Sequence, residues 1–278
     1  MKNMIERVKL FVKEDDFSKS NADIVREKFI KEGFILDDDS FDLAIAIGGD
    51  GTFLRMMKEC SFDDDVIYVG INSGTLGFLQ EVKLEEIDKF LCEIKNGYYK
   101  LEDIGIQETV IEHKNGTSKF YSLNEVVIRD VDLKVIKMEL KIDGEFLECF
   151  SGDGILIATS VGSTAHNLSY GGSIVYDTFS SLQITPMAPL WTRAYRSLPN
   201  SIIIPDKKEI SLTPLYGIQN LSIIVDGEHS EFEAVRLIKT AIDGKKIRRM
   251  RLSHHNFPQK INEKLLTDKN SVIIRDRS

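Results

Sequence analysis

The sequence contains little cysteine and little proline. Its 278 residues include three cysteines, Cys60, Cys92 and Cys149, which lie far apart along the chain. An odd number of widely spaced cysteines argues against both a disulfide framework and a zinc site, so we expect all three to be packing residues. The chain has only six prolines, which argues against long disordered linkers. We therefore expect an ordered protein along nearly its whole length.

Long apolar runs are also missing. No window approaches the about 18 consecutive apolar residues that indicate a membrane-spanning helix. The N-terminal stretch MKNMIERVKLFVKEDD has too short an apolar run and too many charges for a signal peptide. These features predict a cytoplasmic protein without a membrane partner.

Positive charge is in deficit. The chain has 36 Lys and Arg against 44 Asp and Glu, a formal net charge of −8. This charge would repel a nucleic-acid backbone, and the one basic cluster, KKIRRMR at 245–251, is short. We predict that this cluster forms a solvated strand face and that nucleic acid is not a partner. Anionic nucleotides remain candidate ligands, because backbone amides can hold small phosphate groups.

Several catalytic and metal-binding motifs are absent from the sequence. It has no Walker A sequence, no His-Glu-x-x-His and no kinase-type Asp-Phe-Gly. Its five histidines show no metal-ligand spacing. We therefore predict no metal site built from protein side chains alone.

The first hundred residues alternate strand and helix patterns. Gly33 ends the first predicted helix, and continuous apolar runs predict strands covered on both faces of a parallel sheet. The predicted strands are 7–12, 41–49 and 65–74, and the predicted helices are 18–33 and 84–97. This order is typical of a Rossmann-like α/β layer.

After about residue 100 the pattern becomes that of short strands. Asn115-Gly116 and Asp143-Gly144 each lie between strand-like runs and predict hairpins, and later turns recur at roughly ten-residue spacing. We predict an α/β domain over 1–102 and a mostly-β domain over 103–252. The segment 253–278 can form one helix, and we expect it to pack back on the first domain.

The stretch AIAIGGDGTFLR at 44–55 runs from a buried strand into a glycine-rich turn. Ligands of open α/β sheets bind at this place, and Gly48, Gly49 and Gly51 leave backbone N–H groups open to phosphate oxygens. The next residues can start a helix whose N-terminus favours anions. The carboxylate of Asp50 would repel a phosphate unless it accepts a proton from an attacking hydroxyl or helps to hold a divalent cation. The alternative is that Gly-Gly-Asp-Gly is only a turn.

Two further stretches are rich in polar residues. SGDGILIATSVGSTAHNLSYGG at 151–172 combines a turn, an apolar strand and a loop of Gly, Ser, Thr and Asn. In SLNEVVIRD at 122–130, Asn124 and Glu125 open an apolar run. Each has a simpler interpretation on its own, the first as a polar hairpin connection and the second as a solvated strand edge.

Taken together, GGDGT, NE, GDG, GSTA and LSYGG occur in the order and rough spacing of the NAD kinase family, which the chain resembles over most of its length. GTLGFL at 74–79, MAP at 187–189 and VDGE at 225–228 extend the resemblance. Gly-Gly-Asp-Gly alone also occurs in phosphofructokinases and in lipid kinases of the diacylglycerol type. The resemblance implies the NAD kinase/diacylglycerol kinase-like fold, with a β-rich domain that binds NAD.

The resemblance also implies a reaction. The terminal phosphoryl group of ATP, or of inorganic polyphosphate in some members, would pass to the 2′-hydroxyl of the adenosine ribose of NAD, with Mg²⁺ or another divalent cation accompanying ATP. Asp50 would be the catalytic proton acceptor, and because a carboxylate is a weak base it would act by orienting the hydroxyl. The phosphate-binding residues would be Gly48, Gly49, Gly51 and Thr52. The NAD-binding residues would be Asp50, Gly51, Arg55, Phe78, Asn124, Glu125, Asp153, Thr164, Ala165, His166, Asn167, Ser169, Ala188 and Asp226.

The chain departs from the family pattern in one loop. Family members commonly read TPTGSTAYSLSAGGP where this chain has TSVGSTAHNLSYGGS at 159–173. His166 thus replaces a tyrosine expected near adenine, and Ser160 and Ser173 replace prolines that would restrict the backbone. These changes bear on nucleotide affinity rather than on the reaction class.

Two other functions remain open. The chain could be a kinase of another alcohol, a lipid or a sugar phosphate, although it shows no basic amphipathic helix for a membrane surface. It could also be a non-catalytic NAD(P)-binding regulator, which would bind dinucleotide without consuming ATP. The resemblance further implies a homodimer or homotetramer whose sites are completed across subunits.

Overall fold

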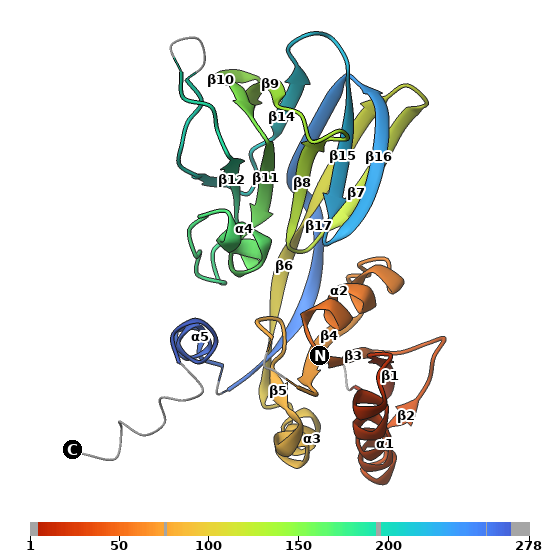
Figure 1. Cartoon of the computed structure of the whole chain (residues 1–278). Helices are drawn as coiled ribbons and strands as arrows, with labels where there is room; N and C mark the ends of the chain where they lie inside the picture. The colour runs from red at the N-terminus through yellow and green to blue at the C-terminus, as the bar shows by residue number, and fades with distance from the viewer. Residues whose placement is uncertain (1–4, 75–76, 193–195, 254, 268–278) are drawn as a thin grey trace, which may run out of the picture. The chain divides into compact units, whose positions relative to one another are not determined.

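A computed structural model describes residues 5–74, 77–192, 196–253 and 255–267, which form two compact units (Figure 1). The first unit combines residues 1–104 with 247–278, and the second unit comprises residues 105–246. Two long strands, β6 (Tyr99–His113) and β17 (Leu237–Leu252), carry the chain from one unit into the other. The first unit is therefore built from both ends of the sequence.

A parallel sheet forms the centre of the first unit. Its order is β4, β3, β1, β2, and β5 and the end of β17 both pair with β4. The strands are β1 (Arg7–Val12), β2 (Ile35–Leu36), β3 (Leu43–Gly48), β4 (Ile67–Asn72) and β5 (Val82–Lys83). Every residue of β3 is buried. Its continuous apolar sequence follows from helices that cover both faces of the sheet.

Three helices cover this sheet. Val25 and Phe29 of α1 and Phe90 of α3 share one core with Ile45 of β3, whereas α2 packs against β3 and β1 from the opposite face. The helices are α1 (Asp16–Lys31), α2 (Asp50–Glu59) and α3 (Ile87–Asn96), the last preceded by the 3₁₀ turn η1 (Leu84–Glu86). The Asp15 side chain caps α1 by accepting the Ser18 N–H at 2.8 Å. No helix within the described residues is long and apolar enough to cross a membrane.

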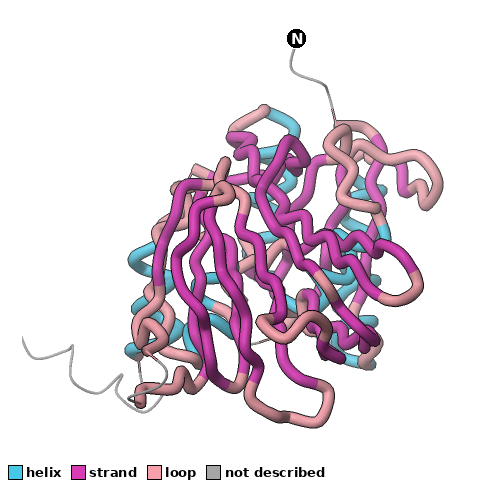
Figure 2. The backbone as a smooth tube through the Cα atoms, turned by 90° about the horizontal axis from the view of Figure 1, so that it is seen from above, coloured by secondary structure: helices cyan, strands magenta, loops and turns pink. Residues whose placement is uncertain are grey.

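The second unit is built almost entirely of strands that pair antiparallel (Figure 1), and strands, drawn in magenta in Figure 2, make up much of the molecule. One sheet has the order β13, β12, β11, β8, β15, β16, and in a second sheet β10, β9, β14 and β17 are neighbours while β6 pairs with β7 and β17. The remaining strands are β7 (Gly116–Ser122), β8 (Glu125–Asp130), β9 (Ile136–Ile142), β10 (Glu145–Gly152), β11 (Gly154–Thr159), β12 (Ser181–Met187), β13 (Ile202–Pro205), β14 (Ile210–Pro214), β15 (Gln219–Val225) and β16 (Glu228–Val235). Buried side chains from both sheets, such as Ile128 and Leu140, form one core. The α/β and mostly-β halves of the predicted fold are thus confirmed.

Residues 247–252 group with the first unit rather than with the predicted range 103–252. The cause is that Arg248 and Arg249 pair in parallel with Ile67 and Tyr68 at the edge of the first sheet. The described part of the segment 253–278 groups with the same unit. It forms a short helix, α5 (Phe257–Ile261), and a π-helical turn, η3 (Asn262–Leu266), instead of one helix. Residues 268–278 of the predicted helix lie outside the described residues.

Two predictions about side chains are wrong. Cys92 and Cys149 are exposed, and only Cys60 is partly buried, so the cysteines are not all packing residues. The KKIRRMR cluster is not a solvated face, because Arg249 is 2% exposed and Arg251 is 7% exposed. Both guanidinium groups are paired with carboxylates, which the basic run alone does not reveal.

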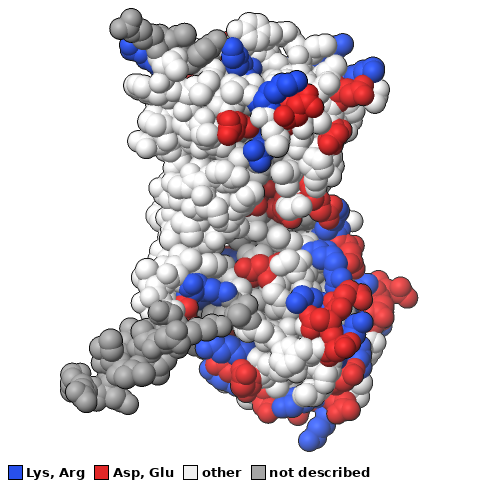
Figure 3. Space-filling model, viewed as in Figure 1, with Lys and Arg blue, Asp and Glu red and all other residues white. Residues whose placement is uncertain are grey.

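The charged side chains on the face drawn in Figure 3 include both signs. Lys and Arg lie interspersed with Asp and Glu, and neither sign covers a continuous area there. The first unit carries exposed ion pairs, such as Lys95 with Glu32 at 2.6 Å and Lys28 with Asp88. Exposed pairs of this kind contribute little to stability.

Candidate active site

Asp50 is the first residue of α2, and a single residue, Gly49, separates it from the end of β3. Its carboxylate accepts the Phe78 N–H at Oδ2, at 2.9 Å, and the Leu79 N–H at Oδ1, at 3.0 Å. These two backbone donors fix the plane of the carboxylate. A carboxylate has about four lone-pair positions, so capacity remains for a ligand.

Gly77 is required beside this carboxylate. A Cβ atom at Gly77 would lie 1.8 Å from Oδ1 of Asp50 and 2.5 Å from its Cγ. Gly48, at the end of β3, is also closely packed, because a Cβ there would lie 2.3 Å from Oγ1 of Thr52. The glycines thus allow the backbone to approach Asp50 and Thr52 closely.

A cavity of about 490 Å³ adjoins this turn within the first unit, and Gly49, Gly51 and Thr52 line one side of it. The start of α1 lines another side, and a 2.8 Å hydrogen bond between the hydroxyls of Ser18 and Ser73 ties that helix end to the residue after β4. The first N–H groups of a helix have no partner within the helix. Two helix N-termini therefore border this cavity, an arrangement that favours anions.

Two cationic side chains also line the cavity. Lys13 lies 2.9 Å from the Asp15 carboxylate, and Arg55 donates from Nη2 to the Val12 carbonyl at 2.5 Å. Asp50 is not among the lining residues, since its carboxylate turns toward Phe78 and Leu79. The cavity thus contains the predicted phosphate-binding residues Gly49, Gly51 and Thr52, with Asp50 beside it.

The donor set near Asp50 fits a divalent cation that arrives with a phosphate ligand. Mg²⁺ usually takes one or two carboxylates, several waters and substrate phosphates rather than a cage of protein ligands. Asp50 offers one carboxylate with unused lone pairs, whereas the side-chain Oδ1 of Asn72 already accepts the Gly74 N–H at 3.1 Å. One protein ligand plus phosphates therefore suits this turn.

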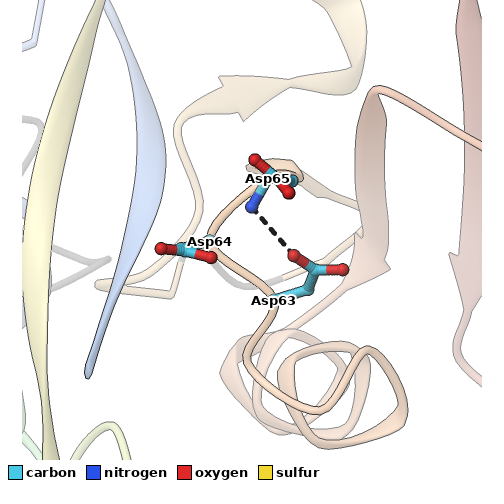
Figure 4. A group of neighbouring side chains, drawn as sticks. All are labelled: Asp63, Asp64 and Asp65. Atoms are coloured by element: carbon cyan, nitrogen blue, oxygen red, sulfur yellow. Dashed lines mark hydrogen bonds between the residues drawn. The ribbon is translucent and has the colours of Figure 1, made fainter.

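Figure 4 shows a different group of carboxylates. Asp63, Asp64 and Asp65 are exposed, and within the described ranges they are the only three acidic, His or Cys side chains found close enough together to share one ion. The Asp63 carboxylate accepts the Asp65 N–H at 2.8 Å, which is a local turn interaction. This loop after α2 has no other sign of ligand binding.

In the second unit, Asp226 holds the backbone around Asn124 and Glu125. Its carboxylate accepts the N–H groups of Leu123, Asn124 and Glu125 at 2.7, 2.8 and 3.1 Å. The Asn124 Oδ1 and Glu125 Oε2 atoms are buried and have no hydrogen-bond partner in the protein. Unpartnered buried oxygens are rare, so a polar ligand group is expected to pair with them.

Glu125 has an unusual protonation equilibrium. Burial, and next the nearby charge of Asp226, raise the pKa of Glu125 from 4.5 to about 8. Burial raises the pKa of Asp226 as well. At neutral pH Glu125 is therefore largely protonated and can donate a hydrogen bond to a ligand.

The raised pKa of Glu125 predicts a change in stability with pH. Because the folded state binds a proton that the unfolded chain releases above about pH 4.5, this residue lowers the free energy of unfolding as the pH rises from about 5 to about 8. Glu125→Gln should remove that contribution. The variant should therefore lose less free energy of unfolding than the parent protein between pH 5 and pH 9. Urea unfolding of both proteins at the two pH values measures this, and parallel pH profiles would contradict it.

The loop after β11 forms two short helical turns, η2 (Val161–Thr164) and α4 (His166–Ser169), rather than an irregular connection. His166 is exposed, with its ring 5.0 Å from that of Tyr170. Asn167 is completely buried; its amide donates to the Ser163 carbonyl, and its oxygen accepts the Thr185 hydroxyl at 2.6 Å. Asn167 thus holds the shape of the loop, while His166 is open to a ligand.

Asn124 also lies against this loop. A Cβ atom on Gly162 would lie 2.0 Å from the Asn124 carbonyl oxygen, and the Thr159 N–H donates to the same oxygen at 2.8 Å. The N–H of His166 is in turn hydrogen-bonded to Glu125. The second unit therefore brings Asn124, Glu125 and Asp226 together with the 164–169 loop.

Asp153 and Ala188 lie elsewhere in the second unit. Both are exposed near the start of β11, where the Asp153 N–H donates to the Met187 carbonyl at 2.9 Å. Asn124 lies at the other end of β11, beside Thr159. Six residues of strand separate the two places, roughly 20 Å. Within one chain, the structure does not bring Asp153 and Ala188 to the Asn124 group.

Two features that contact Asp50 or its neighbours have no recognisable signal in the sequence. Gly77 and Leu79 belong to the GTLGFL stretch, of which only Phe78 was singled out. Gly77 matters because it has no side chain, and Leu79 matters because of its backbone N–H group. Neither property marks a residue as functional in the sequence. The ion pairs of Glu81 with Arg251 and of Glu102 with Arg249 join residues that are far apart in sequence and were also missed.

Comparisons with known proteins agree on one family. Residues 2–99 match the family described as ATP-NAD kinase N-terminal domain, and residues 123–236 match ATP-NAD kinase C-terminal domain. An NAD kinase of Finegoldia magna is 38% identical over 217 residues, covering 76% of this chain and 79% of that protein. NAD kinase 1 of Bacillus cereus is 29% identical over 260 residues, covering 92% of this chain and 97% of that protein.

Solved structures share the fold at low sequence identity. The crystal structure of yeast NADH kinase complexed with NADH has a TM-score of 0.81 at 20% identity, covering 96% of this chain and 89% of that chain. An NAD kinase from Archaeoglobus fulgidus in complex with ATP has a TM-score of 0.74 at 18% identity, covering 92% and 99%. Together, the family matches and the relatives show that this chain belongs to the NAD kinase family.

Proposed function

We propose that this protein transfers the terminal phosphoryl group of ATP to the 2′-hydroxyl of the adenosine ribose of NAD, producing NADP and ADP. The observation that carries this proposal is the carboxylate of Asp50, fixed by two backbone N–H groups beside a cavity with anion-binding helix ends. A carboxylate held next to a phosphate site suits the activation of an attacking hydroxyl. Family membership supports NAD as the acceptor.

The phosphates of the donor are proposed to bind in the 490 Å³ cavity. N–H groups at the starts of α1 and α2, with Lys13 and Arg55, offset their negative charge. A second cavity of about 720 Å³ shares Phe17 and residues 72–74 with the first, which leaves room for a nucleoside. Inorganic polyphosphate would need only the phosphate-binding part. Further charge neutralisation would come from Mg²⁺, held by the phosphates and Asp50.

In the proposed reaction, the ribose hydroxyl oxygen forms a bond to the terminal phosphorus while the bond from that phosphorus to the bridging oxygen breaks. The electron pair of that bond leaves with ADP, and the hydroxyl proton passes to Asp50. Because a carboxylate is a weak base, Asp50 mainly orients the hydroxyl and receives its proton late. The two backbone hydrogen bonds keep Asp50 oriented during this transfer.

Residues of the second unit are proposed to bind NAD. Support comes from the unpartnered buried oxygens of Asn124 and Glu125 and from the exposed ring of His166. We also propose a cytoplasmic homodimer or homotetramer, in which Asp153 and Ala188 act at a site of a neighbouring copy. Their separation from Asn124 by the length of β11 supports this division.

The most direct test is incubation of the protein with NAD, Mg²⁺ and ATP, followed by a coupled assay specific for NADP. We expect NADP to form with one ADP released per NADP, and no NADP without ATP or polyphosphate. ATP consumption with a lipid or sugar phosphate but not with NAD would favour a kinase of another alcohol. Dinucleotide binding without any ATP consumption would favour a regulator.

A further inference from the structure

A buried cluster of charges lies in the first unit next to the residues that hold Asp50. At its centre is Glu81, whose side chain is 2% exposed. Its carboxylate pairs with Arg251 at 2.8 Å, with His255 at 3.1 Å and with Lys260 at 3.3 Å, and it also accepts the Leu252 N–H at 3.1 Å. The positive charges come from β17, the residues after it and α5.

Glu102 completes this cluster on β6. Its Oε2 accepts from Arg249 at 2.8 Å and from Arg251 at 2.8 Å, so Arg251 bridges the two carboxylates. We call Glu81, Glu102, Arg249, Arg251, His255 and Lys260 the Glu81 cluster. Burial alone would raise the pKa of Glu81, but the hydrogen bond with His255 and the charges of Lys260 and Arg251 outweigh it and lower that pKa. Burial lowers the pKa of Lys260 to about 8. Desolvation of such groups is costly, so a buried cluster of this kind adds little net stability.

The Glu81 cluster is joined to Asp50 by four consecutive residues. Phe78 and Leu79 donate their N–H groups to the Asp50 carboxylate, and the next carbonyl, that of Gln80, accepts a 2.6 Å hydrogen bond from Lys260. Glu81 follows directly. This segment, 78–81, is therefore held by Asp50 at one end and by Lys260 and the Glu81 cluster at the other.

The side chain of Gln80 shows how tightly this segment is packed. It is completely buried, and neither polar atom of its amide has a hydrogen-bond partner in the protein. A Cβ atom at Gly70 of β4 would lie 2.1 Å from the Gln80 Oε1, so the segment lies directly on the sheet. With its side-chain amide unpaired, Gln80 anchors the segment through its backbone carbonyl, and a backbone hydrogen bond to the sheet runs from the Glu81 N–H to the Gly70 carbonyl at 2.9 Å. Lys260 and Glu81 supply that anchoring.

We propose that Lys260, together with Glu81, is a positioning residue for Asp50. The inference rests on the proposed function, in which Asp50 receives the hydroxyl proton. Lys260 donates to the Gln80 carbonyl, and the Glu81 carboxylate accepts the Leu252 N–H at the end of β17. These two contacts fix the N–H groups of Phe78 and Leu79 in the positions from which they donate to Asp50. Strand β17 and helix α5 thus orient a carboxylate near the start of the chain.

Lys260→Met is the test variant, because methionine keeps the length of the side chain and leaves Glu81 paired with Arg251 and His255. We expect kcat to fall on the order of tenfold, with KM for ATP and for NAD nearly unchanged, because the misoriented carboxylate affects the chemical step. The matched control is Lys95→Met, which breaks an exposed Lys–Glu pair of the same unit. It should leave kcat unchanged.

Lys260→Arg should recover most of the lost kcat, because a guanidinium keeps the charge and can donate to the Gln80 carbonyl. A cavity of about 120 Å³ that borders Glu81, His255 and Lys260 leaves room for it. In addition, amide hydrogen exchange at Phe78 and Leu79 should be about tenfold faster in Lys260→Met, with exchange in β3 unchanged. This measurement does not depend on any assumed reaction.

A double variant separates positioning from a general loss of structure. If Lys260 acts through Asp50, adding Lys260→Met to Asp50→Asn should lower kcat by less than twofold more. Three results would each overturn the inference: a further tenfold loss of kcat in the double variant relative to Asp50→Asn, unchanged exchange at Phe78 and Leu79, or a wild-type kcat in Lys260→Met. If Asp50→Asn keeps its turnover, the proposed role of Asp50 fails instead; if the parent protein forms no NADP, the proposed function fails. In either case the exchange result still decides whether Lys260 holds the segment.

Discussion

Asp50→Asn is expected to lower kcat by on the order of 10²-fold or more while the protein stays folded. The asparagine oxygen can still accept one of the two N–H groups of Phe78 and Leu79, so the turn keeps much of its structure. Its amide group cannot receive the proton of the ribose hydroxyl. Steady-state kinetics with NAD and ATP, and circular dichroism of the variant, measure the two parts of this result.

Asp42→Asn provides a matched control for the backbone contacts. The Asp42 carboxylate also accepts two backbone N–H groups, those of Glu6 and Arg7, both at 2.9 Å, and it belongs to the same unit. We expect a modest loss of stability and a normal kcat for this variant. If Asp50→Asn had a wild-type kcat, Asp50 would not take part in the chemistry.

Gly77→Ala is expected to have a similarly large effect without changing any polar group. The new methyl group would lie 1.8 Å from the Asp50 Oδ1, so the carboxylate has to move. Because the end of a side chain can shift more easily than backbone, the protein should still fold. A displacement of about 1 Å at a reacting group can cost about 10²-fold in rate, and we expect kcat to fall by about that amount.

The variant Asp50→Asn/Gly77→Ala tests whether this loss comes through Asp50. Its kcat should be within about threefold of that of Asp50→Asn, since the displaced group has already lost its function. If the fold-loss of kcat in the double variant equalled the product of the two single losses, Gly77 would act in another way than through Asp50. A wild-type kcat for Gly77→Ala would mean that the carboxylate position is not critical.

Much of the fold follows from local patterns in the sequence. The apolar runs ending at Gly48 and Asn72 become the buried parallel strands β3 and β4, and Asp143-Gly144 forms the turn between β9 and β10. In each case neighbouring residues alone determine the structure, through burial on both faces or through turn geometry. Such features can be predicted without knowledge of distant contacts.

Features that depend on distant partners could not be predicted in this way. The basic run at 245–251 resembles an exposed strand face, yet Arg249 and Arg251 are buried because Glu81 and Glu102 neutralise them. Those carboxylates lie more than a hundred residues earlier in the chain. A single sequence gives no sign of this pairing. Because burial of an unpaired arginine would be too costly, the basic run considered alone predicts exposed side chains.

The candidate site was predictable to a similar extent. The glycine-rich turn makes Asp50 a candidate, because the carboxyl end of a buried parallel strand is where open α/β sheets bind ligands, while a simple turn would account for the same residues. The donors that hold Asp50 are backbone N–H groups, and any residue except proline at 78 and 79 provides them. Strand register decides which predicted residues lie close together, and it places Asp153 at the far end of β11 from Asn124.

The order of residues in the two units bears on how the chain folds while it leaves the ribosome. The second unit is one continuous stretch, 105–246, and is complete before the first unit receives its last strand and α5. Until then, Glu81 lacks its cationic partners Arg251 and Lys260. Nascent chains that stop near residue 246 should therefore resist protease over 105–246 and be cleaved readily around Glu81, because the residues that neutralise Glu81 have not yet been made.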